Sequence, residues 1–229
     1  MRSLLPPTLD EVRAARERLR GIAVRTPLLR LNVDAPAAIW LKCENLQPIG
    51  SFKLRGAANA MAQLPPDTLA RGVSTASAGN MAQGVAWSAR RFGVPCTVVV
   101  PEQAPQVKVA AIERLGASVT KVPFDAWWRA MAEHGAEGVP GTFIHPFADP
   151  AVLAGNGTIA LEILEDLPEP DAVLVPYGGG GLSTGIAATL RALRPEVRVY
   201  ACEVATAAPL AASLAAGTPQ TIPYVPSFV

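Results

Sequence analysis

Three short segments of the sequence combine residue types that suit the binding and activation of a small anionic molecule. The first, Gly50–Gly56, holds Lys53 and follows an apolar, strand-like segment, Trp40–Cys43. A lysine that is partly removed from water loses its proton more easily, and its neutral amine can form a Schiff base with a carbonyl compound. Taken alone, this spacing is more typical of a solvated lysine at the start of a helix.

The second segment, Ser77–Asn80, follows another strand-like stretch and opens a helical one. Its small residues leave backbone N–H groups accessible at a helix N-terminus, where a carboxylate is stabilised. The side chains of Ser77 and Asn80 add further hydrogen-bonding groups. The segment suits a substrate carboxylate, although an ordinary helix cap is the more common origin of such a pattern.

The third segment is a run of four glycines, Gly178–Gly181, between a strand-like and a helical stretch. Successive glycines let the backbone wrap around an anion with consecutive N–H donors, and the dipole of the following helix favours a phosphate. A flexible turn rarely needs four successive glycines at this place. The run therefore favours phosphate binding.

The stretch Ala172–Glu203 also has the outline of a dinucleotide-binding strand–helix–strand unit, with an acidic residue at its end. Its glycine spacing departs from that motif. When the motif G-x-G-x-x-G is started at Gly179, its second glycine falls on Gly181, but its third falls on Thr184. A dinucleotide-dependent oxidoreductase stays open as an alternative, but it leaves the lysine and serine segments unexplained.

The elements that must position these groups alternate between strand and helix. Strands are predicted near residues 40–43, 72–75, 96–100, 118–122, 142–144, 172–176 and 197–202, and helices near 9–20, 80–92, 125–137, 150–167, 182–193 and 207–216, with two further helices that begin after Ser51 and at Pro105. Repeated units of this length predict an α/β fold of parallel sheets covered by helices on both faces, with the three segments at the carboxyl ends of strands.

Composition narrows the function classes. Of 229 residues, 20 are Lys or Arg and 19 are Asp or Glu, so the net charge of +1 gives no indication of nucleic acid or an anionic membrane as a partner. No apolar run reaches the length of a bilayer span. The three cysteines (Cys43, Cys96 and Cys202) lie far apart and suggest buried thiols in a reducing compartment, so we expect a cytoplasmic protein.

Together the three segments resemble one family, the threonine and serine dehydratases. Ser51–Gly56 resembles their cofactor-lysine motif, Ser77–Gly84 their substrate-carboxylate loop, and Gly178–Gly181 with Leu182 their phosphate loop. The resemblance covers the whole chain. Shorter matches fall in the family's order at residues 101–102, 108, 145–147 and 154–158.

The resemblance implies a tryptophan-synthase-β-like fold with pyridoxal 5'-phosphate in a cleft between two α/β domains. The smaller domain, residues 49–148, would bind the substrate carboxylate, and the larger, residues 1–48 and 149–229, the cofactor phosphate. Cysteine and threonine synthases share the fold but typically place an acidic residue after the cofactor lysine. Leu54 and Arg55 instead indicate the dehydratase branch.

The family's activity is the elimination of water from a 3-hydroxy amino acid, which gives a 2-oxo acid and ammonia. By resemblance, Lys53 carries the cofactor as a Schiff base and removes the Cα proton of the substrate. The implied cofactor-binding residues are Phe52, Lys53, Asn80, Gly178, Gly179, Gly180, Gly181 and Leu182, and the implied substrate-carboxylate residues are Ser77, Ala78, Gly79, Asn80 and Met81.

Two departures from the family pattern bear on the substrate. Met81 stands where relatives often have histidine, and Phe147 where some have asparagine. Both changes make the predicted pocket more apolar. They predict that the pocket admits a β-substituent bulkier than the methyl group of threonine, such as the phenyl group of phenylserine.

Other positions lack a group that an additional activity would need. Ala78 aligns with the serine that racemase relatives use as a second acid–base group, so we expect elimination rather than racemisation. Glu203 is the only weak candidate for a metal site, because residues 204–209 contain no carboxylate. His134 and His145 are interpreted as structural.

The resemblance also implies a homo-oligomer and a small amino-acid substrate as the only partners. Relatives continue beyond the position of residue 229, after the apolar extended run Pro226–Val229. We therefore expect the group that bonds the pyridine nitrogen to lie outside this sequence, and an uncovered sheet edge without it. A non-catalytic chain that only binds the cofactor is a further alternative.

Overall fold

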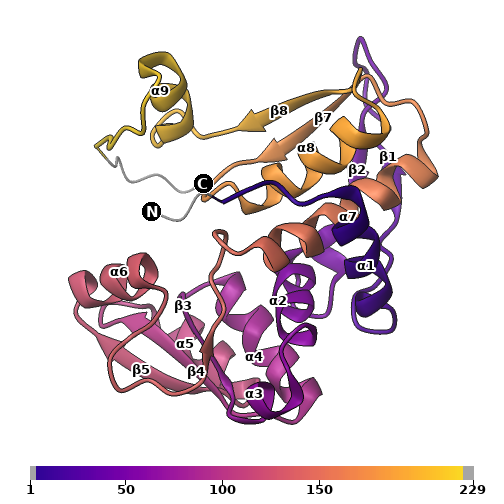
Figure 1. Ribbon diagram of the computed structural model, residues 1–229. Helices are drawn as coiled ribbons and strands as arrows, with labels where there is room; N and C mark the ends of the chain where they lie inside the picture. The colour runs from indigo at the N-terminus through magenta and orange to yellow at the C-terminus, as the bar shows by residue number, and fades with distance from the viewer. Residues whose placement is uncertain (1–3, 224–229) are drawn as a thin grey trace.

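The computed structural model describes residues 4–223, so the predicted run Pro226–Val229 lies outside it. Two separate parallel sheets flank a central layer of helices (Figure 1). Within the described residues, no helix is long and apolar enough to cross a membrane. The helices are α1 Leu9–Leu19, α2 Lys53–Ala62, α3 Pro66–Ala70, α4 Asn80–Phe92, α5 Gln106–Arg114, α6 Phe124–Glu133, α7 Pro150–Asp166, α8 Gly181–Leu193 and α9 Pro209–Ala216.

The larger sheet has four parallel strands in the order β5-β4-β3-β6. Its strands are β3 Val73–Ala76, β4 Cys96–Pro101, β5 Ser118–Val122 and β6 Thr142–Phe143. All four residues of β3 are buried, as a central strand requires. Helices α2, α4 and α5 pack on one face and α6 on the other, which confirms the expected α/β architecture.

The second sheet consists of β7 (Ala172–Pro176) and β8 (Arg198–Cys202), which are parallel and connected by α8. Val175 faces a cluster formed with α7 and α8. The opposite face is open, because the paired residues Leu174 and Tyr200 are 67% and 48% exposed. Helices therefore cover both faces of the larger sheet but only one face of this one, within residues 4–223.

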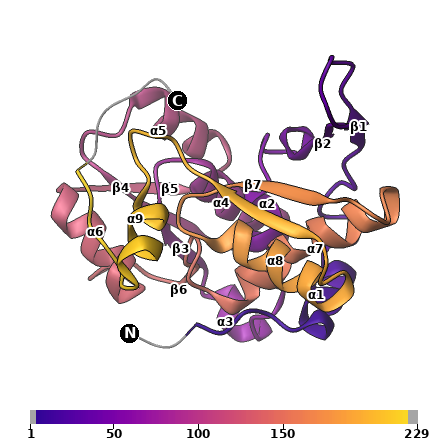
Figure 2. The same ribbon diagram turned by 90° about the horizontal axis from the view of Figure 1, so that it is seen from above.

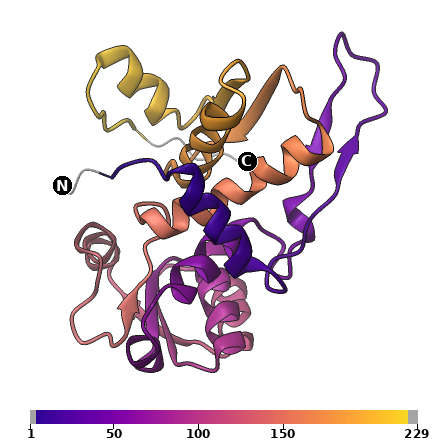
Figure 3. The ribbon, with the colours of Figure 1, turned by 45° about the vertical axis from the view of Figure 1, so that its right-hand side comes forward.

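The strand before Lys53 differs from the prediction. It is β2 (Trp40–Lys42), which pairs antiparallel with β1 (Leu28–Arg30) in a hairpin that projects from the molecule (Figures 2 and 3). A short 3₁₀ helix, Glu44–Leu46, follows β2. The lysine thus lies at the start of α2 and not at the carboxyl end of a parallel strand.

Helix α2 is held between α4 and α7 by glycines that allow backbone contact. A Cβ atom on Gly84 of α4 would lie 3.2 Å from the carbonyl oxygen of Lys53. A Cβ atom on Gly155 of α7 would lie 2.5 Å from the carbonyl oxygen of Arg55. Because both contacts fall in the first turn of α2, they fix the end of the helix from which Lys53 extends.

Replacement of Gly155 by alanine should destabilise the protein. The added methyl group meets only backbone atoms, which cannot move aside, and overpacking of this kind costs about 1–3 kcal/mol. That cost exceeds the gain of roughly 1 kcal/mol in helix propensity from glycine to alanine. Chemical denaturation of Gly155→Ala should give a lower free energy of unfolding than the wild type.

Gly135→Ala is the matched control, because a Cβ atom at Gly135 has no neighbour within 4 Å. It should unfold within about 0.5 kcal/mol of the wild type, as surface substitutions do. Equal stability of the two variants would contradict the backbone contact between α2 and α7.

Candidate active site

Lys53 is the first residue of α2 and has a partly buried side chain. Its Nζ donates a hydrogen bond of 2.8 Å to the carbonyl oxygen of Pro146 and lies 5.3 Å from the ring centroid of Phe52. Burial lowers the pKa of Lys53 from 10.5 to about 8. The side chain therefore supplies the easily deprotonated amine that the sequence motif predicts.

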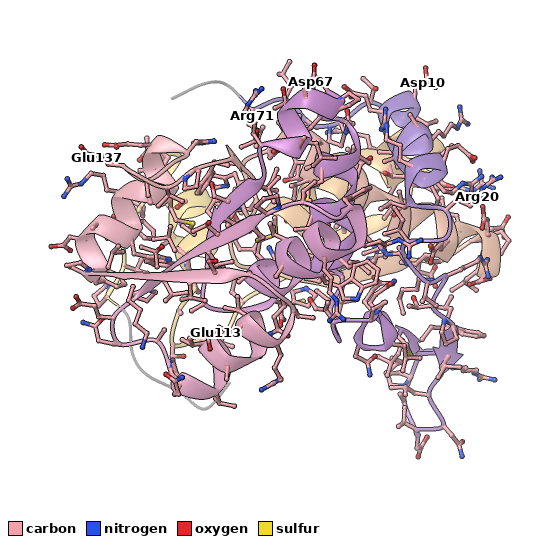
Figure 4. All side chains as sticks on the ribbon, turned by 90° about the horizontal axis from the view of Figure 1, so that it is seen from below. Asp10, Arg20, Asp67, Arg71, Glu113 and Glu137 are labelled. Carbon is pink, nitrogen blue, oxygen red and sulfur yellow. The ribbon has the colours of Figure 1, made fainter. Side chains whose placement is uncertain are left out.

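A buried ion cluster anchors the turn that follows Lys53. Most charged side chains lie on the surface, as Figure 4 shows for Asp10, Arg20, Asp67, Arg71, Glu113 and Glu137. The side chain of Arg55 is instead 2% exposed. Its guanidinium donates to both carboxylate oxygens of Glu44 at 2.8 Å and to those of Glu162 at 2.6 and 2.9 Å.

The charges of this cluster balance. Lys42 Nζ lies 2.5 Å from Glu162, so two cations face two carboxylates. Burial alone lowers the pKa of Arg55, but the hydrogen bonds to Glu44 and Glu162 raise it above the ordinary value. None of the three sequence motifs indicates this cluster. The available signal was Glu162, an acidic residue inside the apolar stretch 159–164.

The glycine run forms a backbone cradle at the start of α8. Gly180 precedes the helix with φ +84°, a conformation that favours glycine. Thr184 N–H donates to Gly180 O at 2.9 Å, so helix geometry leaves the N–H groups of residues 181–183 for an outside acceptor. Leu182, the last residue predicted for this loop, packs against the cluster between α7 and α8.

Phe147 explains why side chains are excluded from two positions of the run. A Cβ atom on Gly179 would overlap the Phe147 ring. One on Gly181 would lie 3.0 Å from the Phe147 Cα. The cradle therefore depends on glycine for close packing as well as for backbone conformation, and Gly178, with open space around it, completes the run.

The Ser77–Asn80 segment lies where β3 ends and α4 begins. Ser77 Oγ accepts a hydrogen bond of 3.1 Å from the N–H of Gly79, and Ala78 packs against the core of the four-stranded sheet. Asn80 is exposed, and a Cβ atom on Gly79 would meet nothing within 4 Å. The segment thus offers an open helix N-terminus beside β3.

The Met81 side chain does not line this open space. It is 2% exposed and packs in the core under the four-stranded sheet. An apolar side chain in the core does not enlarge a pocket, so Met81 gives no support to the prediction of a bulkier substrate.

The structure brings the predicted segments together around the start of α2. Pro146 contacts Lys53, and the next residue, Phe147, contacts the glycine run. Gly84, one turn into the helix that Asn80 begins, contacts the backbone of Lys53. Lys53 and the glycine run, more than 100 residues apart in the chain, therefore both contact the 146–147 segment, and Ser77–Asn80 opens the helix that contacts Lys53.

Glu203, the weak candidate for a metal ligand, binds backbone N–H groups of α9 in the structure. Its two carboxylate oxygens accept hydrogen bonds of 2.9 Å from the N–H groups of Leu210 and Ala211. The carboxylate thereby caps the first turn of α9. Across residues 4–223, no group of three or more His, Cys, Asp or Glu side chains is arranged to hold a metal ion.

Comparison with known families identifies the chain. The family model described as "Pyridoxal-phosphate dependent enzyme" matches residues 19–229. The chain belongs to this family. The strand–loop–helix–strand unit of β7, α8 and β8 is therefore accounted for without a dinucleotide.

Similar proteins include both lyases and racemases. The chain is 42% identical to an L-threonine ammonia-lyase of Thermotoga maritima, over 96% of this chain and 56% of that protein. It is 43% identical to the serine racemase of Homo sapiens, over 86% of this chain and 60% of that protein. The chain thus spans little more than half the length of these relatives.

Solved structures confirm the fold. The crystal structure of serine racemase from Dictyostelium discoideum superposes with a TM-score of 0.84 at 38% identity, covering 94% of this chain and 71% of that one. The expected fold class, shared with this family of pyridoxal-phosphate enzymes, is therefore confirmed.

The residues present fit the family's cofactor. Pyridoxal phosphate needs an amine for its aldehyde, an anion site for its phosphate and a surface for its ring. Lys53 supplies a partly buried amine of lowered pKa, and the free N–H groups of residues 181–183 suit the phosphate. Phe52 lies beside Lys53 and packs against the cluster between α7 and α8.

The lowered pKa of Lys53 predicts its reactivity. In the cofactor-free protein, acetylation of Lys53 by acetic anhydride should follow a titration with a midpoint near pH 8. Peptide mass spectrometry measures it, with exposed Lys121 as the reference peptide. A midpoint near 10.5 would contradict the burial of this amine.

The lowered pKa of Lys53 also makes the free energy of unfolding depend on pH. Between about pH 8 and 10.5 the unfolded chain retains the Lys53 proton and the folded chain does not. The contribution of Lys53 to the free energy of unfolding should therefore rise with pH across this window. Below pH 8 the buried ammonium lowers stability to its full extent.

Proposed function

We propose that this protein is a pyridoxal-phosphate-dependent ammonia-lyase that converts a 3-hydroxy amino acid into a 2-oxo acid and ammonia. The observation that supports it most is the environment of Lys53, a partly buried amine of lowered pKa that bonds to Pro146, next to the Phe147 that packs against the glycine run. The similarity to L-threonine ammonia-lyase over 96% of the chain favours this reaction class.

The roles of the residues follow from their positions. Lys53 would hold the cofactor through its Nζ, and the same atom would accept the proton from the substrate Cα. Bound pyridoxal phosphate would supply an electron sink for the negative charge left on the Cα. The N–H groups of Gly178–Gly181 and Leu182 hold the phosphate, and Phe52 packs near the ring.

The Ser77–Met81 segment binds the substrate carboxylate in this proposal. Ser77 and the N–H groups of Ala78, Gly79 and Met81 surround it, and Asn80 reaches both the carboxylate and the cofactor oxygen. This segment lies at the open N-terminus of α4, where the helix dipole stabilises a negative charge. Because Ala78 has no exchangeable side-chain proton, the second face of the Cα lacks an acid–base group, which favours elimination over racemisation.

The remaining assignments belong to the same proposal. Residues 49–148 form the smaller, substrate-binding domain, and residues 1–48 with 149–229 belong to the larger one. The enzyme acts in the cytoplasm as a homo-oligomer. Threonine and serine are the first substrates to consider, and phenylserine tests the apolar contribution of Phe147.

Purified protein supplied with pyridoxal phosphate should release a 2-oxo acid and ammonia from at least one of these amino acids. Lys53→Ala should lose all of this turnover, because the substitution removes the amine proposed to bind the cofactor and to accept the Cα proton. Coupled assays of 2-oxo acid and ammonia measure both. Lys121→Ala, which removes an exposed lysine of β5, should retain full activity.

The same assay separates the alternatives. Visible absorption of the bound cofactor without ammonia release would indicate a chain that binds the cofactor but does not catalyse the elimination. Chiral analysis of the serine that remains after partial reaction should find only the L form. D-serine produced at a rate near that of elimination would contradict the role given to Ala78.

A further inference from the structure

His145 forms the centre of a small turn between β6 and α7. Its side chain is buried, with 4% exposure. Nδ1 accepts hydrogen bonds from the N–H groups of Phe147 at 3.2 Å and Ala148 at 2.8 Å. The ring of Phe147 stands edge-on to the imidazole at a centroid distance of 4.6 Å.

This turn contacts the candidate active site on two sides. The carbonyl oxygen of Pro146 accepts the hydrogen bond from Lys53 Nζ at 2.8 Å. Phe147 packs against Gly179 and Gly181 of the glycine run. Proline has no N–H group, so the first N–H groups after His145 are those of Phe147 and Ala148, and both bind the imidazole.

We propose that His145 is a positioning residue, whose neutral imidazole holds residues 146–148 so that Pro146 orients Lys53 and Phe147 supports the glycine run. The inference rests on the proposed function, in which Lys53 binds the cofactor. It assigns to His145 a role that its sequence context, outside the three motifs, does not indicate.

The hydrogen bonds determine which tautomer the imidazole adopts. Two N–H donors point at Nδ1, so the proton of the neutral ring resides on Nε2. Burial lowers the pKa of His145 to about 4, and the nearby charges of His134 and Lys53 act in the same direction. A hydrogen bond to the backbone of Met131 opposes these effects. The ring is therefore neutral, and Nδ1 an acceptor, at neutral pH.

Two amide substitutions can separate the acceptor from the bulk of the side chain. In His145→Asn the amide oxygen takes the place of Nδ1, whereas in His145→Gln the longer side chain carries its amide toward the place of Nε2. His145→Leu removes both polar atoms and keeps an apolar side chain. A purely structural role for the ring predicts similar losses in all three variants.

The first measurement uses the cofactor-free protein. In His145→Leu and His145→Gln a loosened turn admits water to Lys53, so the midpoint for Lys53 acetylation should rise by ~1 unit from its wild-type value. In His145→Asn the midpoint should stay at the wild-type value. Thermal unfolding of each variant identifies the temperature range in which all of them are folded, and labelling is done there.

The second measurement is cofactor binding, followed by absorption. His145→Leu and His145→Gln should bind pyridoxal phosphate about tenfold more weakly, the equivalent of ~1.4 kcal/mol. His145→Asn should bind it within about threefold of the wild type. Comparison of Asn with Gln keeps the test valid even if the leucine variant does not fold.

The outcomes distinguish this inference from the proposed function. If all three variants leave the labelling midpoint of Lys53 unchanged, or if Asn behaves like Gln, the inference is wrong. If the midpoints shift as expected but wild-type Lys53 carries no cofactor, the turn positions Lys53 and the proposed function fails instead.

Discussion

Helix α2 contacts the backbones of α4 and α7 directly, and the position of Lys53 follows from this packing. Gly84 and Gly155 remove the side chains that would otherwise separate the helices, so the first turn of α2 is held between two neighbours. Dense packing transmits such constraints because an added methyl group has no void to fill. A lysine on a loop would lack this support. On a helix end held by its neighbours, the backbone position from which the lysine side chain extends is fixed.

The pKa values of two basic side chains in that turn are shifted in opposite directions, because their hydrogen-bond partners differ. Arg55 keeps its charge because Glu44 and Glu162 each bind it through both carboxylate oxygens. Removing one partner of such a buried pair typically costs about 3–5 kcal/mol. Lys53, two residues earlier, has a carbonyl oxygen and an aromatic ring as neighbours, so burial lowers its pKa. The difference in partners makes one residue an anchor and the other a reactive amine.

Local features of the fold could be predicted from the sequence. The bounds of α4, β5 and β7 agree with the pattern. These features depend on neighbours within a few residues. The antiparallel pairing of β2 could not be predicted, because a short apolar strand has the same pattern with either kind of partner.

The contacts that complete the site depend on long-range packing. Arg55 and Glu162 are 107 residues apart, and Lys53 and Pro146 are 93 apart. Motif resemblance pointed to Lys53 and the glycine run, but nothing local indicated that Phe147 packs against the glycine run or that His145 shapes the turn. The burial of Met81 likewise depends on how α4 packs against its sheet.

Lys53 is the residue proposed to bind the cofactor, and the small number of lysines makes this binding directly measurable. The chain contains four lysines, Lys42, Lys53, Lys108 and Lys121. Protein incubated with pyridoxal phosphate, reduced with borohydride and digested should carry the cofactor mass on the Lys53 peptide alone. Cofactor on Lys42, Lys108 or Lys121 with none on Lys53, or no modified peptide at all, would contradict this role of Lys53.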